Sequence, residues 1–286
     1  MLYYDKNKVY ISEELYYTIY RKKKRVILAP CDELKKKQQY IKRAINWVYP
    51  LEMDILKSAQ IHRGRDKCLG NKWILKLDIK DFYNSVPYEH IKQVMNNVAL
   101  RINNVDANDY LRMTTVNEKL PTGAPTSAHI ANACFQPLDN FIRTYCNNFG
   151  INYSRYMDDM TFSADEKFYL NMAEKYVTRL LTGNGYCLNK KKTKYISDNK
   201  QQNVLGLVVN GDRVRLPKEF KRKIRAMIHS YTLSKSQTSQ IDIKHRDWGE
   251  EKIAKLKGYL AFIKQVDYDF YIKITRTNGI LPICKV

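Results

Sequence analysis

The sequence predicts an α+β fold, and three observations predict it. Apolar residues recur at helical spacing over 32–48, a hydrophobic run over 73–77 is typical of a buried strand, and two long helical patterns follow Pro217. Hydrophobic residues make up 44% of the 286-residue chain, which is ordinary globular usage and argues against disorder. The chain is therefore long enough for two or three subdomains with sizeable cores.

Helices and strands are mixed along the chain. Pro30 closes the first predicted strand, and Asp32 is placed to cap the helix that follows. The predicted hairpin has a tight turn at Met157-Asp158, and Asn210-Gly211 stops the last strand. In chain order, the sequence predicts a strand over 25–29, a helix over 32–48, a strand over 73–77, a helix over 130–145, a hairpin over 152–163, a helix over 167–181, a strand over 204–209 and two helices after Pro217.

The charge of the chain indicates an anionic partner. Lys and Arg number 50 against 29 Asp and Glu, which gives a formal net charge of +21. Much of the excess lies in the stretches 21–43 and 190–225. Together with 22 tyrosines, these cations offer charges for phosphates and rings for stacking on bases. This composition favours nucleic-acid binding that weakens steeply with salt.

Other features exclude several classes of protein. The six cysteines are spread without any close pair, which argues against a zinc module or a disulfide framework. The longest wholly apolar runs are far shorter than the roughly 20 residues that a membrane span needs. The N-terminal stretch has no secretion signal, so a cytoplasmic protein without a membrane is expected.

Three aspartates stand out by their positions. Asp78 ends the strand predicted over 73–77, and Asp158 and Asp159 lie at the tip of the predicted hairpin. If these strands are neighbours in one sheet, the three carboxylates converge and repel one another unless cations neutralise them. Mg²⁺ prefers carboxylates with substrate phosphates, and two such ions support in-line displacement. The pattern indicates nucleotidyl transfer, although an Asp pair in a turn can also serve turn geometry alone.

Five strings of residues occur in an order that is shared with a known family. An Asp is followed five places later by an aromatic in Asp78–Tyr83, and Tyr-x-Asp-Asp occurs at Tyr156–Asp159. The strings Leu120–Ser127, Asn189–Thr193 and Val204–Leu207 match the second, fourth and fifth motifs of the family. With these motifs the sequence resembles the reverse transcriptases from about residue 20 to 275.

The resemblance implies a right-hand polymerase fold. Its palm is an antiparallel sheet with flanking helices, and its thumb is helical. The fingers are expected over 1–70 with part of 99–130, the palm over 71–98 and 131–212, and the thumb over 213–286.

The resemblance also implies the catalytic residues and their ions. Asp78, Asp158 and Asp159 are expected to be catalytic and to bind metal, with the Ile79 carbonyl as a further ligand. The expected cofactor is a pair of Mg²⁺ ions, with Mn²⁺ as the alternative.

Seven residues are expected to bind the deoxynucleoside triphosphate: Tyr83, Thr122, Gly123, Lys192, Arg25, Arg63 and Arg65. Tyr83 matches the sugar-selecting aromatic of the family, whose rigid ring leaves no room for a 2′-hydroxyl; a plain core ring is the alternative. Gly123 permits close approach of the backbone, and Thr122 stands where many relatives have Gln. Lys192 is a candidate proton donor or counter-charge to pyrophosphate, and a solvated lysine is the alternative.

Eight residues are expected to contact primer or template: Tyr156, Met157, Leu205, Gly206, Lys218, Lys221, Arg222 and Arg225. The last four recur at intervals of three or four residues and so share a helix face that suits the backbone of one strand.

A polymerase core of this size, with the strings at 120–132 and 257–264, resembles the bacterial retron reverse transcriptases in particular. That resemblance implies a cognate structured non-coding RNA, part of which is copied from an internal 2′-hydroxyl into a branched RNA–DNA molecule (msDNA) for antiphage defence. An effector protein encoded nearby is a further expected partner. No RNase H, integrase or homing endonuclease domain is expected in a core of this size.

Three features depart from the retron pattern. Val204-Leu205-Gly206 stands where retron enzymes usually have Val-Thr-Gly, Met157 is less typical than Ala, and no Asn-Ala-x-x-His element separates the first two motifs. Three alternatives therefore stay open. They are another bacterial defence reverse transcriptase, including one that makes untemplated DNA from a protein primer, a catalytically idle RNA-binding scaffold, and an RNA-synthesising polymerase of the same architecture.

Overall fold

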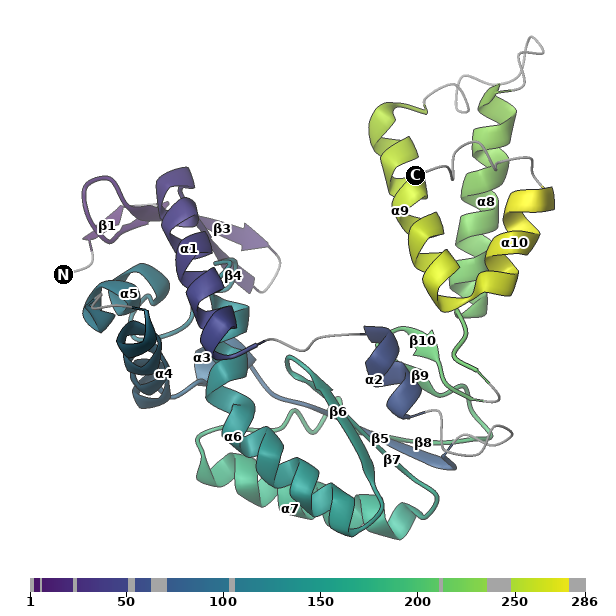
Figure 1. Ribbon diagram of the computed structural model, residues 1–286, viewed down its shortest axis with the longest axis horizontal. Coiled ribbons are helices and arrows are strands. Elements are labelled where there is room, and N and C mark those ends of the chain that lie inside the picture. The colour runs from purple at the N-terminus through teal and green to yellow at the C-terminus, as the bar shows by residue number, and fades with distance from the viewer. Residues whose placement is uncertain are drawn as a thin grey trace. The chain divides into compact units, whose positions relative to one another are not determined.

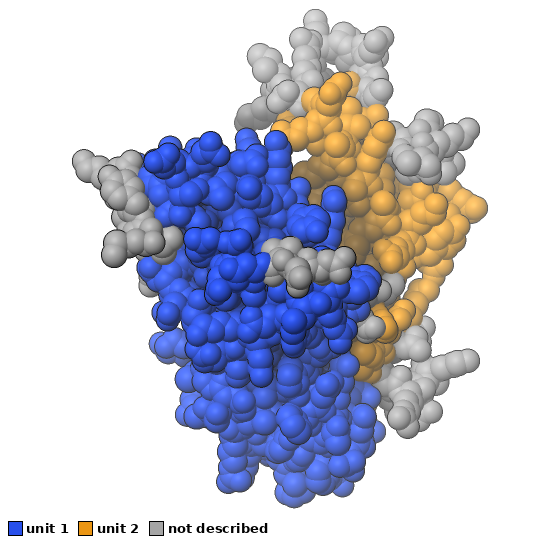
Figure 2. Space-filling model, turned by 60° about the vertical axis from the view of Figure 1, so that its left-hand side comes forward, with its two compact units in different colours: residues 1–54, 73–195 blue, residues 55–72, 196–286 orange. Residues whose placement is uncertain are grey.

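The computed structural model describes residues 3–5, 7–22, 25–50, 55–62, 71–102, 106–210, 213–235 and 248–277. The chain forms two compact units, which Figure 2 shows in blue and orange. Unit 1 comprises residues 1–54 and 73–195, and unit 2 comprises residues 55–72 and 196–286. The boundaries expected for fingers, palm and thumb stay predictions.

The first sheet of unit 1 is an antiparallel meander in chain order. Its strands are β1 (Tyr3–Asp5), β2 (Lys8–Tyr10), β3 (Tyr16–Lys22) and β4 (Arg25–Pro30) (Figure 1). The strand predicted over 25–29 is confirmed as β4. The three strands before it were not predicted, because two of them are only three residues long and β3 is rich in tyrosine; Tyr17 of β3 is fully buried.

Helix α1 (Asp32–Val48) confirms the predicted helix and buries Ile41 and Ile45. The prediction that Asp32 caps this helix is wrong. Cys31 is the N-cap residue and makes no side-chain capping bond, whereas Asp32 lies in the first turn. A carboxylate in the first turn still interacts favourably with the helix dipole.

The second sheet of unit 1 is built around the predicted strand and hairpin, both of which are confirmed. Its strands are β5 (Trp73–Asp78), β6 (Asn152–Tyr156), β7 (Asp159–Ala164) and β8 (Lys194–Ser197), in the order β6-β7-β5-β8. The long helices α6 (Ser127–Asn148) and α7 (Lys167–Gly183) lie along one side of it (Figure 1). Phe135 of α6 and Phe162 of β7 are fully buried in the resulting core.

Three further helices of unit 1 were not predicted. They are α3 (Phe82–Ser85), α4 (Tyr88–Arg101) and α5 (Ala107–Thr114). Helices α4 and α5 pack against each other, and α4 also packs against α6. Phe82 of α3 is buried with them in the core and so anchors the start of this segment directly after β5.

Unit 2 begins with α2 (Ile55–Ile61) and resumes with the short strands β9 (Asn203–Val204) and β10 (Leu207–Val208). The prediction of one continuous strand over 204–209 is wrong. Leu205 and Gly206 have φ angles of 50° and 87°, so they form a two-residue turn between two antiparallel strands. Positive φ at both central residues is the type I′ pattern, which matches the twist of a hairpin.

Two helices were predicted after Pro217, and the structure describes three there, so the prediction is confirmed for two helices and missed the third. The three helices are α8 (Lys218–Lys235), α9 (Glu250–Val266) and α10 (Tyr268–Thr277). Among the described residues, no helix has the length and apolar character that a membrane span requires.

Candidate active site

The strand and the hairpin that carry the three aspartates are neighbours, as expected. β5 pairs antiparallel with β7, and Asp78 lies directly opposite Asp159. The main-chain N–H of Ile79 donates to the carbonyl of Asp158 over 3.0 Å. Residues separated by about 80 positions therefore come together at one end of the sheet, with Asp78 itself only 5% exposed.

The turn of the hairpin is strained. Tyr156 pairs with Asp159, so Met157 and Asp158 are the two central residues. Met157 has a φ of 55°, a left-handed conformation that costs a bulky residue about 1–3 kcal/mol. Such a conformation persists only where the surroundings hold it.

The side chain of Arg155 supplies this support. Its Nη1 donates to the carbonyl of Met157 at 2.9 Å, and its Nε donates to the carboxylate of Asp139 at 2.9 and 3.0 Å. Nη2 donates to Asn132 Oδ1 at 2.7 Å. The Tyr153 hydroxyl donates to Asp139 at 2.6 Å, so the buried carboxylate also has a neutral donor.

Sequence reasoning missed Arg155 and Asp139. A signal was present for each of them. Asp139 interrupts the apolar face of α6 between Phe135 and Ile142, and its side chain is 10% exposed. Arg155 stands inside a strand directly before the Tyr-x-Asp-Asp string, where its guanidinium lies 4.4 Å from the ring of Phe135. A charge on the apolar face of a helix predicts that another element supplies a buried partner of opposite charge.

The electrostatics of the site are dominated by negative charge. Burial raises the pKa of Asp158, and the charges of Asp159 and Asp78 raise it further. Lys192 opposes them, because its Nζ lies 2.6 Å from Asp78 Oδ2. That hydrogen bond, and then the charge of Asp78, raises the pKa of Lys192. The carboxylates thus favour a cation beside them.

The donor set fits Mg²⁺ in its chemistry, since carboxylates and a main-chain carbonyl are oxygen ligands. Within the described parts of the chain, however, no three His, Cys, Asp or Glu side chains gather closely enough to hold an ion. The carboxylate of Asp78 instead accepts a hydrogen bond from Lys192 Nζ at 2.6 Å. Asp78, Asp158 and Asp159, with the Ile79 carbonyl, are the groups that would hold the metal, and this assignment stays a prediction.

Tyr83 lies on α3, half-buried beside the turn. Burial raises the pKa of its phenol, and the charges of Asp158 and Tyr156 raise it further, which places the ring close to the hairpin. Phe82 serves the core instead, 5% exposed and packed edge-on against Phe135. Tyr83 is only partly buried against the same core, and its role in sugar selection stays a prediction.

Thr122 and Gly123 contact the first sheet of unit 1. The N–H of Leu28 in β4 donates to the Thr122 carbonyl at 2.7 Å. Gly123 has a φ of 116°, and a Cβ there would lie 2.8 Å from Ile27 Cγ2 and 2.9 Å from the Leu28 oxygen. The missing Cβ thus lets β4 approach, while contact of either residue with a nucleotide stays a prediction.

Three of the expected triphosphate ligands are not among the described side chains. Arg63 and Arg65 lie outside the described residues, as does the side chain of Arg25, whose backbone pairs with Lys22.

The expected primer and template contacts divide between the units. Tyr156 and Met157 lie in the hairpin of unit 1, whereas Leu205 and Gly206 form the β9–β10 turn of unit 2. Contact of these four residues with one primer or template strand stays a prediction.

The four basic residues of α8 do not form a uniform face. Lys221 lies 2.6 Å from Asp267 and 4.8 Å from the ring of Phe270 in α10, and Arg225 lies 5.1 Å from the same ring. Two of the four are therefore engaged with α10, and Lys218 and Arg222 are exposed.

Comparison with known proteins identifies the family of the chain. The family model for reverse transcriptase (RNA-dependent DNA polymerase) matches residues 6–209. The retron Ec86 reverse transcriptase of Escherichia coli is 29% identical over 249 residues, which cover 86% of this chain and 73% of that protein. The retron Mx65 reverse transcriptase of Myxococcus xanthus is 27% identical over 238 residues, covering 77% of this chain and 52% of that protein.

A solved structure shares the fold. Telomerase from Candida albicans, in complex with a fragment of telomeric RNA, superposes with a TM-score of 0.53 at 12% identity and covers 92% of this chain and 55% of that one. The predicted α+β polymerase fold is confirmed. With most of its length matched by the family model, the chain belongs to the reverse transcriptase family of RNA-dependent DNA polymerases.

Proposed function

We propose that this RNA-directed DNA polymerase is of the retron type and copies part of a cognate structured non-coding RNA into branched RNA–DNA for antiphage defence. The observation that carries the chemistry is the pairing of Asp78 with Asp159, with Asp158 at the adjoining turn. The similarity to retron enzymes over 86% of the chain supports the type. A cytoplasmic location and a nearby effector protein belong to the same proposal.

Each residue of the proposed active site has its own role in catalysis. Asp78, Asp158 and Asp159 would hold the divalent ions, two Mg²⁺ with Mn²⁺ as the alternative, and the bound ions would supply activation of the attacking hydroxyl and stabilisation of the leaving oxygen. Tyr83 excludes a 2′-hydroxyl from the sugar of the incoming deoxynucleotide. Lys192 provides positive charge where the pyrophosphate departs. Arg155 keeps the turn in the conformation that presents Asp158.

Primer extension on RNA tests the polymerase activity of the proposed site. The full chain, given primed RNA, deoxynucleotides and Mg²⁺, should extend the primer, and Asp158→Asn should abolish extension while RNA binding persists. Asp165→Asn is the matched control, because Asp165 is an exposed carboxylate on the same hairpin segment. Activity that survives Asp158→Asn contradicts the assignment of this site.

Sequencing the nucleic acid that co-purifies with the protein tests the retron type. A DNA strand joined to RNA through a 2′-hydroxyl, with a templated sequence, is the expected product. Untemplated homopolymer DNA linked to protein would instead assign the chain to another class of defence reverse transcriptase, and RNA without any DNA would favour an idle scaffold.

A further inference from the structure

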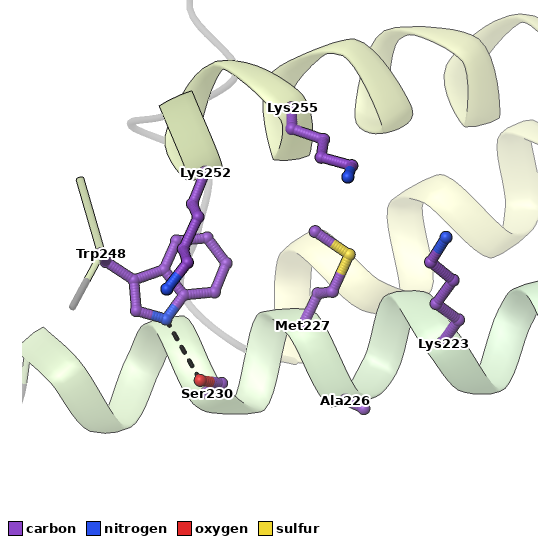
Figure 3. Close-up of a pocket in the computed structure, with 7 residues that line it drawn as sticks. All are labelled: Lys223, Ala226, Met227, Ser230, Trp248, Lys252 and Lys255. Carbon is purple, nitrogen blue, oxygen red and sulfur yellow. Dashed lines mark hydrogen bonds between the residues drawn. The ribbon is translucent and has the colours of Figure 1, made fainter. Parts of the chain in front are cut away.

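Unit 2 contains a cavity of about 450 Å³ that lies between α8 and α9. The residues that line it are Lys223, Ala226, Met227, Ser230, Trp248, Lys252 and Lys255 (Figure 3). Binding sites for small ligands typically measure roughly 300–1,000 Å³. None of the seven lining residues carries a negative charge, so the cavity suits an anionic group.

One end of the cavity is an oriented aromatic surface. Trp248 Nε1 donates to Ser230 Oγ at 3.1 Å, which fixes the indole against α8. Tyr231 packs edge-on against the same ring, with centroids 5.2 Å apart at 75°. Met227 and Ala226 continue the apolar surface along α8. A fixed ring beside apolar groups suits a flat ligand that stacks.

The other feature is concentrated positive charge. Lys255 from α9 and Lys223 from α8 extend over Met227, as Figure 3 shows. Lys223 Nζ lies 3.2 Å from the Tyr259 hydroxyl. The hydrogen bond from Lys223, with the charges of Lys223 and Lys255, lowers the pKa of Tyr259. Ammonium groups gathered from two helices create a positive potential at the mouth of the cavity.

We propose that this cavity captures an unpaired nucleotide of the bound nucleic acid, with its base against Trp248 and its phosphates at the lysines. A duplex exposes phosphates but no base face, so it would leave the apolar end unused, whereas unpaired bases stack on aromatic side chains. The inference rests on the proposed function, which supplies an RNA partner. It adds to that function a second site, which binds a nucleotide and takes no part in catalysis.

Binding of labelled oligonucleotides to the full chain tests the proposal. Lys255→Glu should raise the Kd for single-stranded RNA at least about tenfold at fixed salt, because it reverses a charge at the cavity. Lys257→Glu is the matched control, since Lys257 is an exposed lysine on the same helix outside the cavity. It should change the Kd less than about threefold. Blunt duplex RNA should respond weakly to both variants.

Fluorescence gives a second measurement that needs no charge change. Single-stranded RNA should quench the tryptophan emission, and Trp248→Phe, which keeps a ring in the packing, should remove most of that quenching. A single-stranded DNA of the same sequence shows whether the template RNA or the DNA product supplies the captured nucleotide. Tighter binding of either single strand than of duplex supports the proposal that the cavity binds an unpaired nucleotide. Equal effects of Lys255→Glu and Lys257→Glu, or displacement of RNA by polyglutamate at equal charge, overturn the proposal.

Primer extension separates this inference from the proposed function. At saturating primed RNA, Lys255→Glu should extend at the wild-type rate, because the cavity holds no catalytic group. If wild type fails to extend any primer while Lys255→Glu still loses single-stranded binding, the proposed function fails and the cavity assignment stands. If the wild type extends primers but neither Lys255→Glu nor Trp248→Phe changes the binding of single strands, the cavity assignment is wrong and the proposed function stands.

Discussion

The guanidinium of Arg155 holds the main-chain oxygen of Met157 at 2.9 Å. Met157 is the residue of the turn with a φ of 55°, and Asp158 follows it. The same guanidinium is anchored to Asp139, whose side chain is 10% exposed. A buried ion pair therefore fixes the backbone that presents the carboxylate of Asp158, the proposed catalytic residue.

Weakening this bond should slow the chemical step. Arg155→Lys keeps the charge but cannot bond Asp139 and the Met157 carbonyl in the same planar fork. We expect kcat for primer extension to fall by about 10- to 100-fold and the Mg²⁺ concentration for half-maximal rate to rise. KM for the primed RNA should stay unchanged.

Two further measurements separate positioning from loss of folding. Arg143→Lys, an exposed arginine of α6, should leave both kinetic constants unchanged. Arg155→Lys should remain folded by circular dichroism, because charge remains beside Asp139, whereas Asp139→Ala leaves a buried cation unpaired and should lower the free energy of unfolding by about 3–5 kcal/mol. A raised KM with unchanged kcat would contradict the positioning role.

Lys192 is distinguished from its two neighbouring lysines by its contact with Asp78 at 2.6 Å. Lys192→Gln removes the positive charge from the carboxylate site, so we expect single-turnover incorporation to slow by at least about tenfold. Lys191→Gln, an exposed neighbour, should change the rate less than about twofold. Equal losses in both variants would indicate general binding of phosphate instead.

Tyr83 should control the choice of sugar. Tyr83→Ala opens space beside the turn, so the ratio of ribonucleotide to deoxynucleotide incorporation should rise at least about tenfold. Tyr83→Phe keeps the ring and should preserve the wild-type ratio. Competition between the two nucleotide types on one primed template measures both. Wild-type protein that already favours ribonucleotides would contradict the role of the ring.

Gly123 should tolerate no side chain. A Cβ at this position would lie 2.9 Å from the backbone oxygen of Leu28, and the φ of 116° is unfavourable for any L-residue. Gly123→Ala should therefore lower the free energy of unfolding by about 1–3 kcal/mol, as denaturant unfolding would show. Gly150→Ala is a useful control, because its Cβ would meet nothing within 4 Å although its φ is also positive.

The elements around the catalytic carboxylates could be predicted because their signals are local. The run at 73–77 and the hairpin turn each depend on a few adjacent residues, and the paired register of Asp78 and Asp159 follows once the strands are neighbours. The β9–β10 turn could not be predicted this way. Leu205 takes positive φ there, and a leucine carries no turn signal of its own.

Side-chain contacts between elements that are distant in the sequence also could not be predicted. Lys221 was expected to face nucleic acid because its spacing on α8 is regular, but Asp267 lies 2.6 Å from it. The helical period identifies residues that share a face; it does not identify what another helix places against that face. The contact of Arg155 with Asp139 was also missed: each charge is visible in its own element, but the pairing of strand β6 with helix α6 is not.

The Lys221–Asp267 ion pair should stabilise the fold. The side chain of Asp267 is 6% exposed and that of Lys221 is 22% exposed. Asp267 also caps α10, because it accepts from the N–H of Phe270 at 3.2 Å. Asp267→Asn keeps a good cap and removes only the charge, so we expect a loss of about 1–2 kcal/mol in the free energy of unfolding. Asp267→Ala should lose about 1 kcal/mol more, since it also removes the cap.

The pH dependence of unfolding tests the ion pair separately from the cap. Burial raises the pKa of Asp267, but the bond and the charge of Lys221 and the N–H groups outweigh it, so the pKa is lowered in the folded protein. A lowered carboxylate pKa stabilises the fold above the unfolded value of about 3.9, and this stability is lost as pH falls through the folded pKa. Wild type should therefore lose stability below about pH 4 more steeply than Asp267→Asn does. Asp269→Asn is the control, because Asp269 lies in the first turn of α10 and forms an exposed ion pair with Arg213. This variant should change the free energy of unfolding by less than about 1 kcal/mol and keep the wild-type slope. Equal slopes for wild type and Asp267→Asn would show that the pair adds nothing to the fold of the helical region.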